Sequence, residues 1–405
     1  MATRPRASTL RLADRMHRFE SEGFDTILAK VAKRRRQGAT VLPLHAGELD
    51  FDTPMSIVGA AKEALDRGDT RYTPAAGKPH LREAIAAYLS RTRGVPVNAD
   101  QVVVTPGAKP MVFMALQALV EAGDEVVDFS PAYPIYCFLV RFMGAVPVPV
   151  ALDPHASLVA DVDALHAAVT DRTRLIIVNT PANPTGAVFM RTALDAIAEV
   201  ALERDVTVLV DEIYSRIIYE GRFESVLAIE GMEDRCIIVD GFSKTFCMTG
   251  WRLGYGVMRS DLAARMATYM TNTLSCNVAF SQEAAVAALA LEDAAIDEMV
   301  AVLARRRELV VSGLRRIPGV RCALPAGAFY VLADLTELGL SSASLAQMLL
   351  DEHGIATYPG SAFGPELEGY LRLSFGAPDG VLEQALEGIA ELVDRVRTEN
   401  SMRSS

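Results

Sequence analysis

The sequence predicts an α/β protein in which a large domain contains a mostly parallel β-sheet. Three observations support this fold class: short apolar runs rich in β-branched residues, helical patterns between several of them, and a change of pattern after residue 280. The expected strands are residues 102–104, 126–129, 175–178, 206–210, 237–239 and 253–257. Apolar runs of this length, bounded by turn signals, are typical of strands that helices bury on both faces. Strands that alternate with helices in this way form parallel sheets.

Helix signals precede the first of these strands. Thr53 and Pro54 are a cap followed by proline at the first helical position, and Gly68 follows the last turn of the same helix. A second helix begins at Pro79 and has an apolar face made of Leu81, Ile85, Ala86 and Leu89. We therefore expect two helices before the sheet begins.

A smaller α+β domain is expected from the C-terminal part of the chain and the N-terminal segment. A long helical pattern through residues 305–316 is followed by short strands near 328–332 and 371–374 and by a final helix over 381–396. We predict that residues 1–50 form an N-terminal arm and part of the small domain. Residues 51–295 then form the large domain, and residues 296–405 complete the small one.

The overall charge argues against nucleic acids and anionic membranes as partners. The chain has 405 residues and a formal net charge of −11, whereas both partners require a basic face. No stretch reaches the length and apolarity of a transmembrane helix. One basic cluster, residues 33–36, is interpreted as the solvated end of an N-terminal helix, and an address or nucleic-acid patch is the alternative.

The cysteine pattern predicts reduced thiols and no metal site. The five cysteines are scattered, without a CxxC pair or a His/Cys spacing typical of zinc ligands. The first ten residues contain arginines but no apolar run, so they do not resemble a signal peptide. We therefore expect a cytoplasmic protein without a disulfide framework.

Small and polar residues follow several expected strands, at the sheet edge where open α/β sheets bind ligands. Gly107, Ala108 and Lys109 begin a helix whose free backbone N–H groups could bind a phosphate, although many capped helices begin with glycine. Tyr133 follows the second strand and either stacks on a flat ligand ring or packs in the core. Asn183 lies in a loop fixed by prolines and a glycine, which leaves its amide free to contact a ligand.

Charged residues follow the next two strands. Asp211 ends an apolar strand, where a carboxylate is costly without a positive partner, so it either caps a helix or faces a cationic ring nitrogen. Lys244 lies between Ser243 and Thr245 and is a candidate Schiff-base nucleophile, although most single lysines are solvated surface charges. Arg252 lies in a glycine-rich stretch that precedes and enters a strand. This position rules out a dinucleotide fingerprint, which needs the glycines between a strand and a helix.

These segments resemble the class I/II aminotransferases of pyridoxal-phosphate fold type I. The resemblance covers nearly the whole chain, and the order and spacing of the motifs make it specific. It rests on Gly47-Glu-Leu-Asp50-Phe51, Tyr72-Thr-Pro, Asn183-Pro-Thr-Gly186, Asp211-Glu-Ile-Tyr214, Ser243-Lys244-Thr-Phe, Gly250-Trp-Arg252-Leu-Gly254-Tyr255, Pro325-Ala-Gly327-Ala-Phe329-Tyr330 and Arg372-Leu-Ser-Phe375.

The resemblance implies pyridoxal 5'-phosphate as cofactor, bound by the large domain. Lys244 would form the Schiff base and carry the proton between the substrate Cα and the cofactor. Asp211 would pair with the ring nitrogen and keep it protonated, so that the ring can take up electrons. Asn183 and Tyr214 would hydrogen-bond the phenolic oxygen of the cofactor, and Tyr133 would stack on its ring.

The same resemblance implies a phosphate site shared between two subunits. Ser243, Arg252 and the backbone at Gly107, Ala108 and Lys109 would hold the phosphate. Tyr72 would reach this site from the other subunit, which makes the protein a homodimer with shared active sites.

The implied substrates are a small-molecule amino acid and a 2-oxo acid, used in a ping-pong mechanism. Arg372 would bind the α-carboxylate in a bidentate fork, helped by Asn183 and by the backbone at Gly47. The sequence around Lys109 resembles the bacterial aspartate/prephenate branch of the family, which favours aspartate or glutamate as amino donor. Lys109 would then bind the distal carboxylate of the substrate. The alternative is that Lys109 is a solvated charge at the start of a helix.

Two other functions share these motifs. The same fold and core residues support other pyridoxal-phosphate chemistry, such as a lyase, cyclase or oxidase of an amino acid in a natural-product pathway. A non-catalytic regulator with this fold is disfavoured. The roughly 40 residues before the first motif are too few for a helix-turn-helix domain with its linker, and Lys244 is present.

Overall fold

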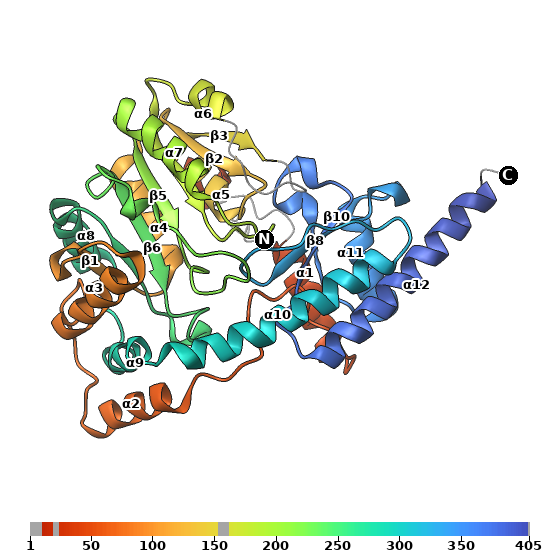
Figure 1. The fold of residues 1–405 in the computed structure, drawn as a ribbon, viewed down its shortest axis with the longest axis horizontal. Helices are drawn as coiled ribbons and strands as arrows, with labels where there is room; N and C mark the ends of the chain where they lie inside the picture. The colour runs from red at the N-terminus through yellow and green to blue at the C-terminus, as the bar shows by residue number, and fades with distance from the viewer. Residues whose placement is uncertain (1–9, 19–23, 153–161, 404–405) are drawn as a thin grey trace, which may run out of the picture.

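The computed structural model describes residues 10–18, 24–152 and 162–403. A seven-stranded sheet forms the centre of the larger part, with strand order β1-β7-β6-β5-β4-β2-β3 (Figure 1). Its strands are β1 (Val102–Thr105), β2 (Glu125–Ser130), β3 (Val146–Ala151), β4 (Thr173–Asn179), β5 (Thr207–Asp211), β6 (Cys236–Gly241) and β7 (Gly254–Val257). Strand β7 runs opposite to the other six strands of this sheet, so the predicted α/β class with a mostly parallel sheet is confirmed.

Strand β3 was not among the predicted strands. It reads Val-Pro-Val-Pro-Val-Ala, and proline in a run argues against a strand because it lacks the N–H that a sheet needs. Strand β3 lies at the edge of the sheet and pairs only with β2 within it. An edge strand tolerates proline because one of its sides has no partner strand.

Helices cover both faces of the large sheet. The helices are α2 (Met55–Asp66), α3 (Pro79–Arg93), α4 (Ala108–Leu119), α5 (Ile135–Met143), α6 (Val162–Ala168), α7 (Arg191–Glu203), α8 (Ser260–Thr273) and α9 (Ala279–Leu289). Alternate strand residues face opposite sides: Leu175 and Ile177 pack with α4, α5 and α8, whereas Ile176 and Val178 belong to the core with α3, α7 and α9. The sheet is therefore buried on both faces, as its apolar runs predicted.

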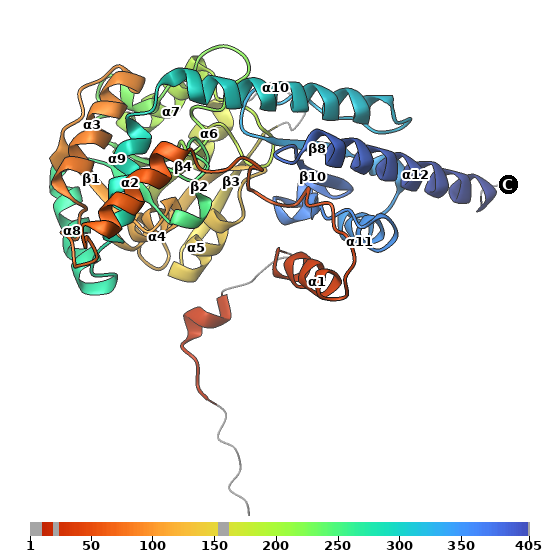
Figure 2. The same ribbon diagram turned by 90° about the horizontal axis from the view of Figure 1, so that it is seen from below.

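The smaller part contains a three-stranded antiparallel sheet, with strand order β8-β10-β9. Its elements are α1 (Phe24–Arg36), β8 (Tyr330–Asp334), α11 (Ser342–His353), β9 (Tyr358–Pro359), β10 (Tyr370–Ser374) and α12 (Asp379–Arg403). The N-terminal helix α1 lies beside α11, where Arg34 forms an ion pair with Asp351 (Figure 2). This arrangement is the predicted α+β unit built from both ends of the chain. The exact boundaries after residues 50 and 295 remain a prediction.

The long helix α10 (Asp293–Arg316) connects the two parts and packs along α12 (Figures 1 and 2). The final helix is longer than predicted at its C-terminal end. Short 3₁₀ helices occur at Asp14–Arg18, Ala99–Gln101, Val226–Ala228, Thr249–Trp251, Thr336–Leu338, Gly360–Ala362 and Pro365–Leu367. Within the described ranges, no helix has the length and apolarity that a bilayer span requires.

Candidate active site

The strand ends of the large sheet open into a cavity of about 920 Å³ that the small domain covers from the other side. Strands β4, β5 and β6 are parallel, so the residues that follow them arrive at one edge of the sheet. The cavity brings together most of the predicted site residues: Gly47, Ala108, Lys109, Tyr133, Asn183, Asp211, Tyr214, Ser243, Lys244, Arg252 and Arg372. Gly107 and Tyr72 do not line it.

Lys244 lies in this cavity at the end of β6. Its Nζ donates a hydrogen bond to the carbonyl oxygen of Gly47. Burial lowers the pKa of Lys244 to about 8, because an ammonium group loses hydration there. The charge of Glu48 opposes this shift, while Arg372 adds to it. An amine with this pKa is partly neutral near physiological pH and can act as a nucleophile.

Asp211 ends β5 and is 8% exposed. Its carboxylate accepts hydrogen bonds from the Tyr136 hydroxyl at 2.8 Å and from the backbone N–H of Ile213 at 3.1 Å. Burial raises the pKa of Asp211 to about 6, although both hydrogen bonds oppose this change. No basic side chain among the described residues forms an ion pair with Asp211. The carboxylate is therefore held in place but lacks a cation.

Tyr214 and Tyr330 lie on opposite sides of the junction between the two domains. Their hydroxyl oxygens are 2.9 Å apart, so one donates a hydrogen bond to the other. Burial raises the pKa of Tyr214 well above its usual value. A Cβ atom at Gly47 would lie 2.9 Å from the Tyr330 hydroxyl, so a larger residue here would displace this hydroxyl. Both phenols are thus neutral hydrogen-bonding groups beside Lys244.

The start of α4 faces Arg252. No side chain caps this helix, whose N-cap residue Gly107 has φ of +94°. A side chain at Gly107 would overlap the guanidinium of Arg252, and one at Gly254 would overlap the backbone of Ala108. Free N–H groups at a helix start, together with an arginine, form an anion site. The two glycines permit the close approach on which this site depends.

Arg372 lies on β10 and is 2% exposed. Its guanidinium donates to Asn183 Oδ1 at 3.1 Å and to the carbonyl oxygen of His45 at 2.6 Å. It also stacks against Tyr330 and Tyr358, with its Cζ 4.4 Å and 4.8 Å from the ring centroids. Within the described part of the chain, no carboxylate lies within ion-pair distance of Arg372, and its Nε has no hydrogen-bond partner. A buried guanidinium without a counter-ion is a candidate binding site for a carboxylate.

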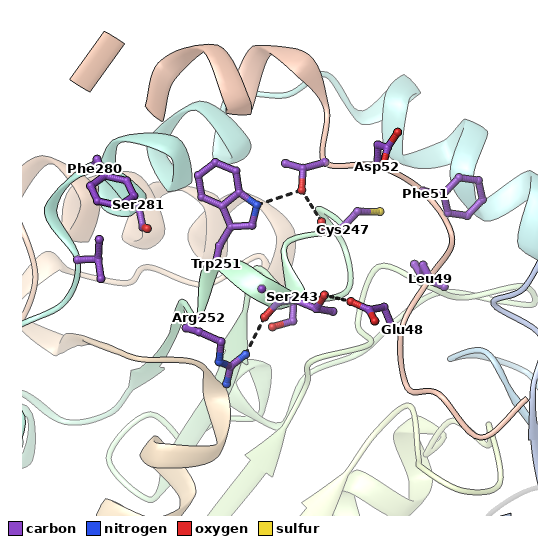
Figure 3. Close-up of a pocket in the computed structure, with 14 residues that line it drawn as sticks. Glu48, Leu49, Phe51, Asp52, Ser243, Cys247, Trp251, Arg252, Phe280 and Ser281 are labelled. Carbon is purple, nitrogen blue, oxygen red and sulfur yellow. Dashed lines mark hydrogen bonds between the residues drawn. The ribbon is translucent and has the colours of Figure 1, made fainter. Parts of the chain in front are cut away.

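A second cavity, of about 540 Å³, lies next to the first and shares Glu48, Leu49, Ser243, Thr249 and Arg252 with it (Figure 3). Its wall joins residues 48–53 to the loop that follows Lys244. Thr53 donates to the Cys247 carbonyl oxygen at 2.6 Å and accepts from the Trp251 indole at 3.1 Å, and Thr249 donates to Glu48. These bonds hold Glu48 and Gly47 beside the lysine.

Several site residues were missed by sequence reasoning. Tyr136, which hydrogen-bonds Asp211, stands three residues after Tyr133, and this helical spacing was an available signal. Tyr358 and His45 carried no such signal, because they reach the cavity only through the packing of the small domain. No cluster of three or more potential metal-binding side chains occurs within the described ranges.

Comparison with known proteins identifies the family. Residues 39–389 match the family model for aminotransferases of class I and II. The chain is 37% identical to an aspartate aminotransferase of Rhizobium meliloti, with 94% of this chain and 96% of the relative covered. It is also 37% identical to an aspartate/prephenate aminotransferase of Thermus thermophilus, over 95% of this chain and 99% of that one. The solved structure of Thermus thermophilus aspartate aminotransferase with maleate has a TM-score of 0.89 at 36% identity, with 95% of this chain and all of that one covered. The match across nearly its whole length shows that this chain belongs to the class I and II aminotransferases.

Proposed function

We propose that this aminotransferase uses pyridoxal 5'-phosphate to move an amino group from an acidic L-amino acid to a 2-oxo acid in a ping-pong reaction. One observation carries the proposal. A lysine with a lowered pKa, a buried acid without a cation and a buried arginine without a carboxylate meet in a single cavity. The cofactor and the substrate together would satisfy all three groups.

The cavity residues fit pyridoxal phosphate. Asp211 is a buried carboxylate that a protonated ring nitrogen would pair with, and the uncapped start of α4 with Arg252 suits a phosphate. Tyr133 and Asn183 line the same cavity and are proposed to contact the ring and its phenolic oxygen, the latter together with Tyr214. When bound, the cofactor supplies a carbonyl group for amines and a cationic ring that takes up electrons.

The protein's own contribution is to orient the substrate and to move a proton. Arg372 would bind the α-carboxylate in a fork, beside Asn183 and the backbone at Gly47. With the carboxylate held there, the bond from Cα to hydrogen would face Lys244. Because the pKa of Lys244 is lowered to about 8, its amine can accept this proton and release it again near neutral pH.

The acidic substrate is supported by the position of Lys109 and by the relatives. Lys109 lies at the start of α4 and lines the cavity, with its Nζ 5.7 Å from the centroid of the Tyr133 ring. Lys109 is an exposed cation, whereas Arg372 is buried, and we propose that Lys109 binds the side-chain carboxylate while Arg372 binds the α-carboxylate. The relatives with 37% identity are named for aspartate and for aspartate or prephenate.

A homodimer with shared active sites is part of the same proposal. Tyr72 is 90% exposed, and the exposed apolar residues Met55, Leu274 and Val278 lie on neighbouring elements. Val278 also lines the second cavity, next to Arg252. We propose that this cavity receives Tyr72 of the partner subunit, which would complete the phosphate site.

The cytoplasmic location predicted from the cysteine pattern is also part of this proposal, and the free, buried thiols of Cys236 and Cys322 support it.

The test is to add single amino acids to the cofactor-loaded protein and to follow the absorbance of the cofactor. Aspartate or glutamate is expected to convert the cofactor to its amine form, and oxaloacetate or 2-oxoglutarate to reverse the change. Lys109→Met is expected to weaken the response to both acids about tenfold and to leave neutral donors unaffected, because it removes one charge-assisted contact. Stoichiometric ammonia release, or a response only to non-acidic amino acids, would contradict the proposal and favour a lyase or another substrate.

A further inference from the structure

A buried glutamine fixes the loop that carries Tyr72. Gln282 lies on α9 and has no exposed surface. Its Oε1 accepts a hydrogen bond from the backbone N–H of Lys78 at 2.8 Å, and its Nε2 donates to Thr73 Oγ1 at 3.0 Å. One side-chain amide thus bridges the two ends of the segment that follows Tyr72.

The same amide joins this loop to a second loop. Gln282 Nε2 also donates to the carbonyl oxygen of Asn277 at 3.2 Å, and Thr73 Oγ1 donates to that oxygen at 3.4 Å. Asn277 in turn donates to the carbonyl oxygen of Val104 in β1 at 2.9 Å. Removing the amide would leave the partly buried backbone N–H of Lys78 without this acceptor, which costs more than the loss of a fully exposed contact.

Other contacts around the loop are weaker determinants of its shape. Lys78 forms ion pairs with Asp69 at the start of the loop and with Glu283 on α9. These side chains are partly exposed, so solvent screens their attraction. The backbone N–H of Val104 also donates to Ala76 at 2.9 Å and fixes the middle of the segment. Gln282 remains the fully buried side chain among these contacts.

We propose that Gln282 is a positioning residue that acts in trans: it holds Tyr72 in the conformation needed to complete the phosphate site of the other subunit. This inference rests on the proposed homodimer. It is supported by the arrangement of α9, because Phe280 and Ser281, the two residues before Gln282, line the second cavity beside Arg252 (Figure 3). One short segment therefore borders both the loop that would be given to the partner and the cavity that would receive the partner's loop. A two-fold symmetric interface requires such a self-complementary patch.

The experiment uses hybrid dimers, purified with two different affinity tags, in which one subunit carries Lys244→Ala. Such a dimer keeps one lysine-containing site, made of Lys244 from one subunit and Tyr72 from the other. Gln282→Leu is placed either on the Lys244→Ala subunit, where it acts in trans on that site, or on the subunit that retains Lys244. The readout is the concentration of pyridoxal phosphate needed for half-maximal attachment to Lys244, trapped with borohydride.

The expected result is about tenfold weaker binding for the trans hybrid and less than a twofold change for the cis hybrid, since the loss corresponds to about one hydrogen bond. The cis hybrid contains the same substitution, so its normal affinity also shows that Gln282→Leu folds. Thr73→Val removes the other end of the bond and is expected to give the same trans pattern. A loss in the cis hybrid, or no loss in either, overturns the role of Gln282.

Tyr72→Ala separates this inference from the homodimer proposal. If Tyr72→Ala weakens binding only in trans while Gln282→Leu does not, the shared site stands and the positioning role is wrong. If Tyr72→Ala has no trans effect, the shared site itself is wrong, and the role of Gln282 is overturned with it.

Discussion

Two buried arginines, Arg93 and Arg372, lie near the same strand ends and have opposite surroundings. Arg93, at the end of α3, donates to Glu212 at 2.7 Å, to Ser215 at 2.8 Å and to Asp240 at 3.2 Å. Arg372 donates hydrogen bonds to an amide and a carbonyl oxygen and stacks on aromatic rings, and no carboxylate in the described part of the chain pairs with it. Arg93 is fully paired within the protein, whereas Arg372 is held in place with its charge uncompensated.

The two clusters share strands β5 and β6. Glu212, which pairs with Arg93, directly follows Asp211, which faces the cavity. Asp240, the other partner of Arg93, precedes the loop that carries Lys244. Burial is therefore a poor guide to function here, because both clusters are buried. The useful distinction is whether each charge has its counter-ion inside the chain.

The largest effect is expected from Arg93→Ala. Removing this side chain leaves Glu212 and Asp240 buried without a cation, which should lower the free energy of unfolding by about 3–5 kcal/mol. Urea unfolding of the purified protein measures this change. Arg91→Ala on the same helix is the control, because Arg91 is exposed, and it should change stability by less than about 0.5 kcal/mol. Similar stabilities for the two variants would contradict a structural role for the Arg93 cluster.

Arg372→Leu should lower activity rather than stability. The variant loses the binding site for the α-carboxylate, so kcat/KM is expected to fall at least about 100-fold, equivalent to about 2.7 kcal/mol. Its free energy of unfolding should not decrease, because the substitution removes a buried charge that has no counter-ion. Arg372→Lys keeps the charge but not the planar fork, and its kcat/KM should lie between those of the unmodified protein and of Arg372→Leu. A destabilised variant with unchanged kcat/KM would show that Arg372 belongs with Arg93 as a structural residue.

The sequence predicted the cluster that lines the cavity better than the paired cluster around Arg93. Lys244, Asp211 and Asn183 were identified because each follows an apolar strand, and parallel strands end at one edge. Arg93 gave no signal, since it lies at a helix end like many solvated arginines. Its burial depends on how α3 packs against the sheet, which local sequence does not specify.

Tertiary packing also decides the other features that the sequence did not predict. Strand β3 was missed because its prolines suit only an edge position, and edge positions are set by the order of strands. Tyr358 and Tyr330 meet Arg372 because the small sheet closes on the large one. Patterns with a period of two or 3.6 residues predict elements and their faces, but not which distant elements meet.

The smallest effect is expected from the titration of Lys244, which lines the same cavity as Asp211 and Arg372. In the folded protein burial lowers its pKa from 10.5 to about 8. Between these two values the unfolded chain binds a proton that the folded chain does not, so stability should rise with pH across this range. Urea unfolding of the cofactor-free protein should therefore show the free energy of unfolding increasing from pH 8 to pH 10 relative to Lys244→Met, which lacks the amine. The difference should stay small, because Lys244 keeps part of its surface exposed and solvent therefore screens its charge. A difference that is constant across this range, or that falls with pH, would mean that Lys244 is as well compensated as Arg93, and that the contrast between the two clusters does not extend to it.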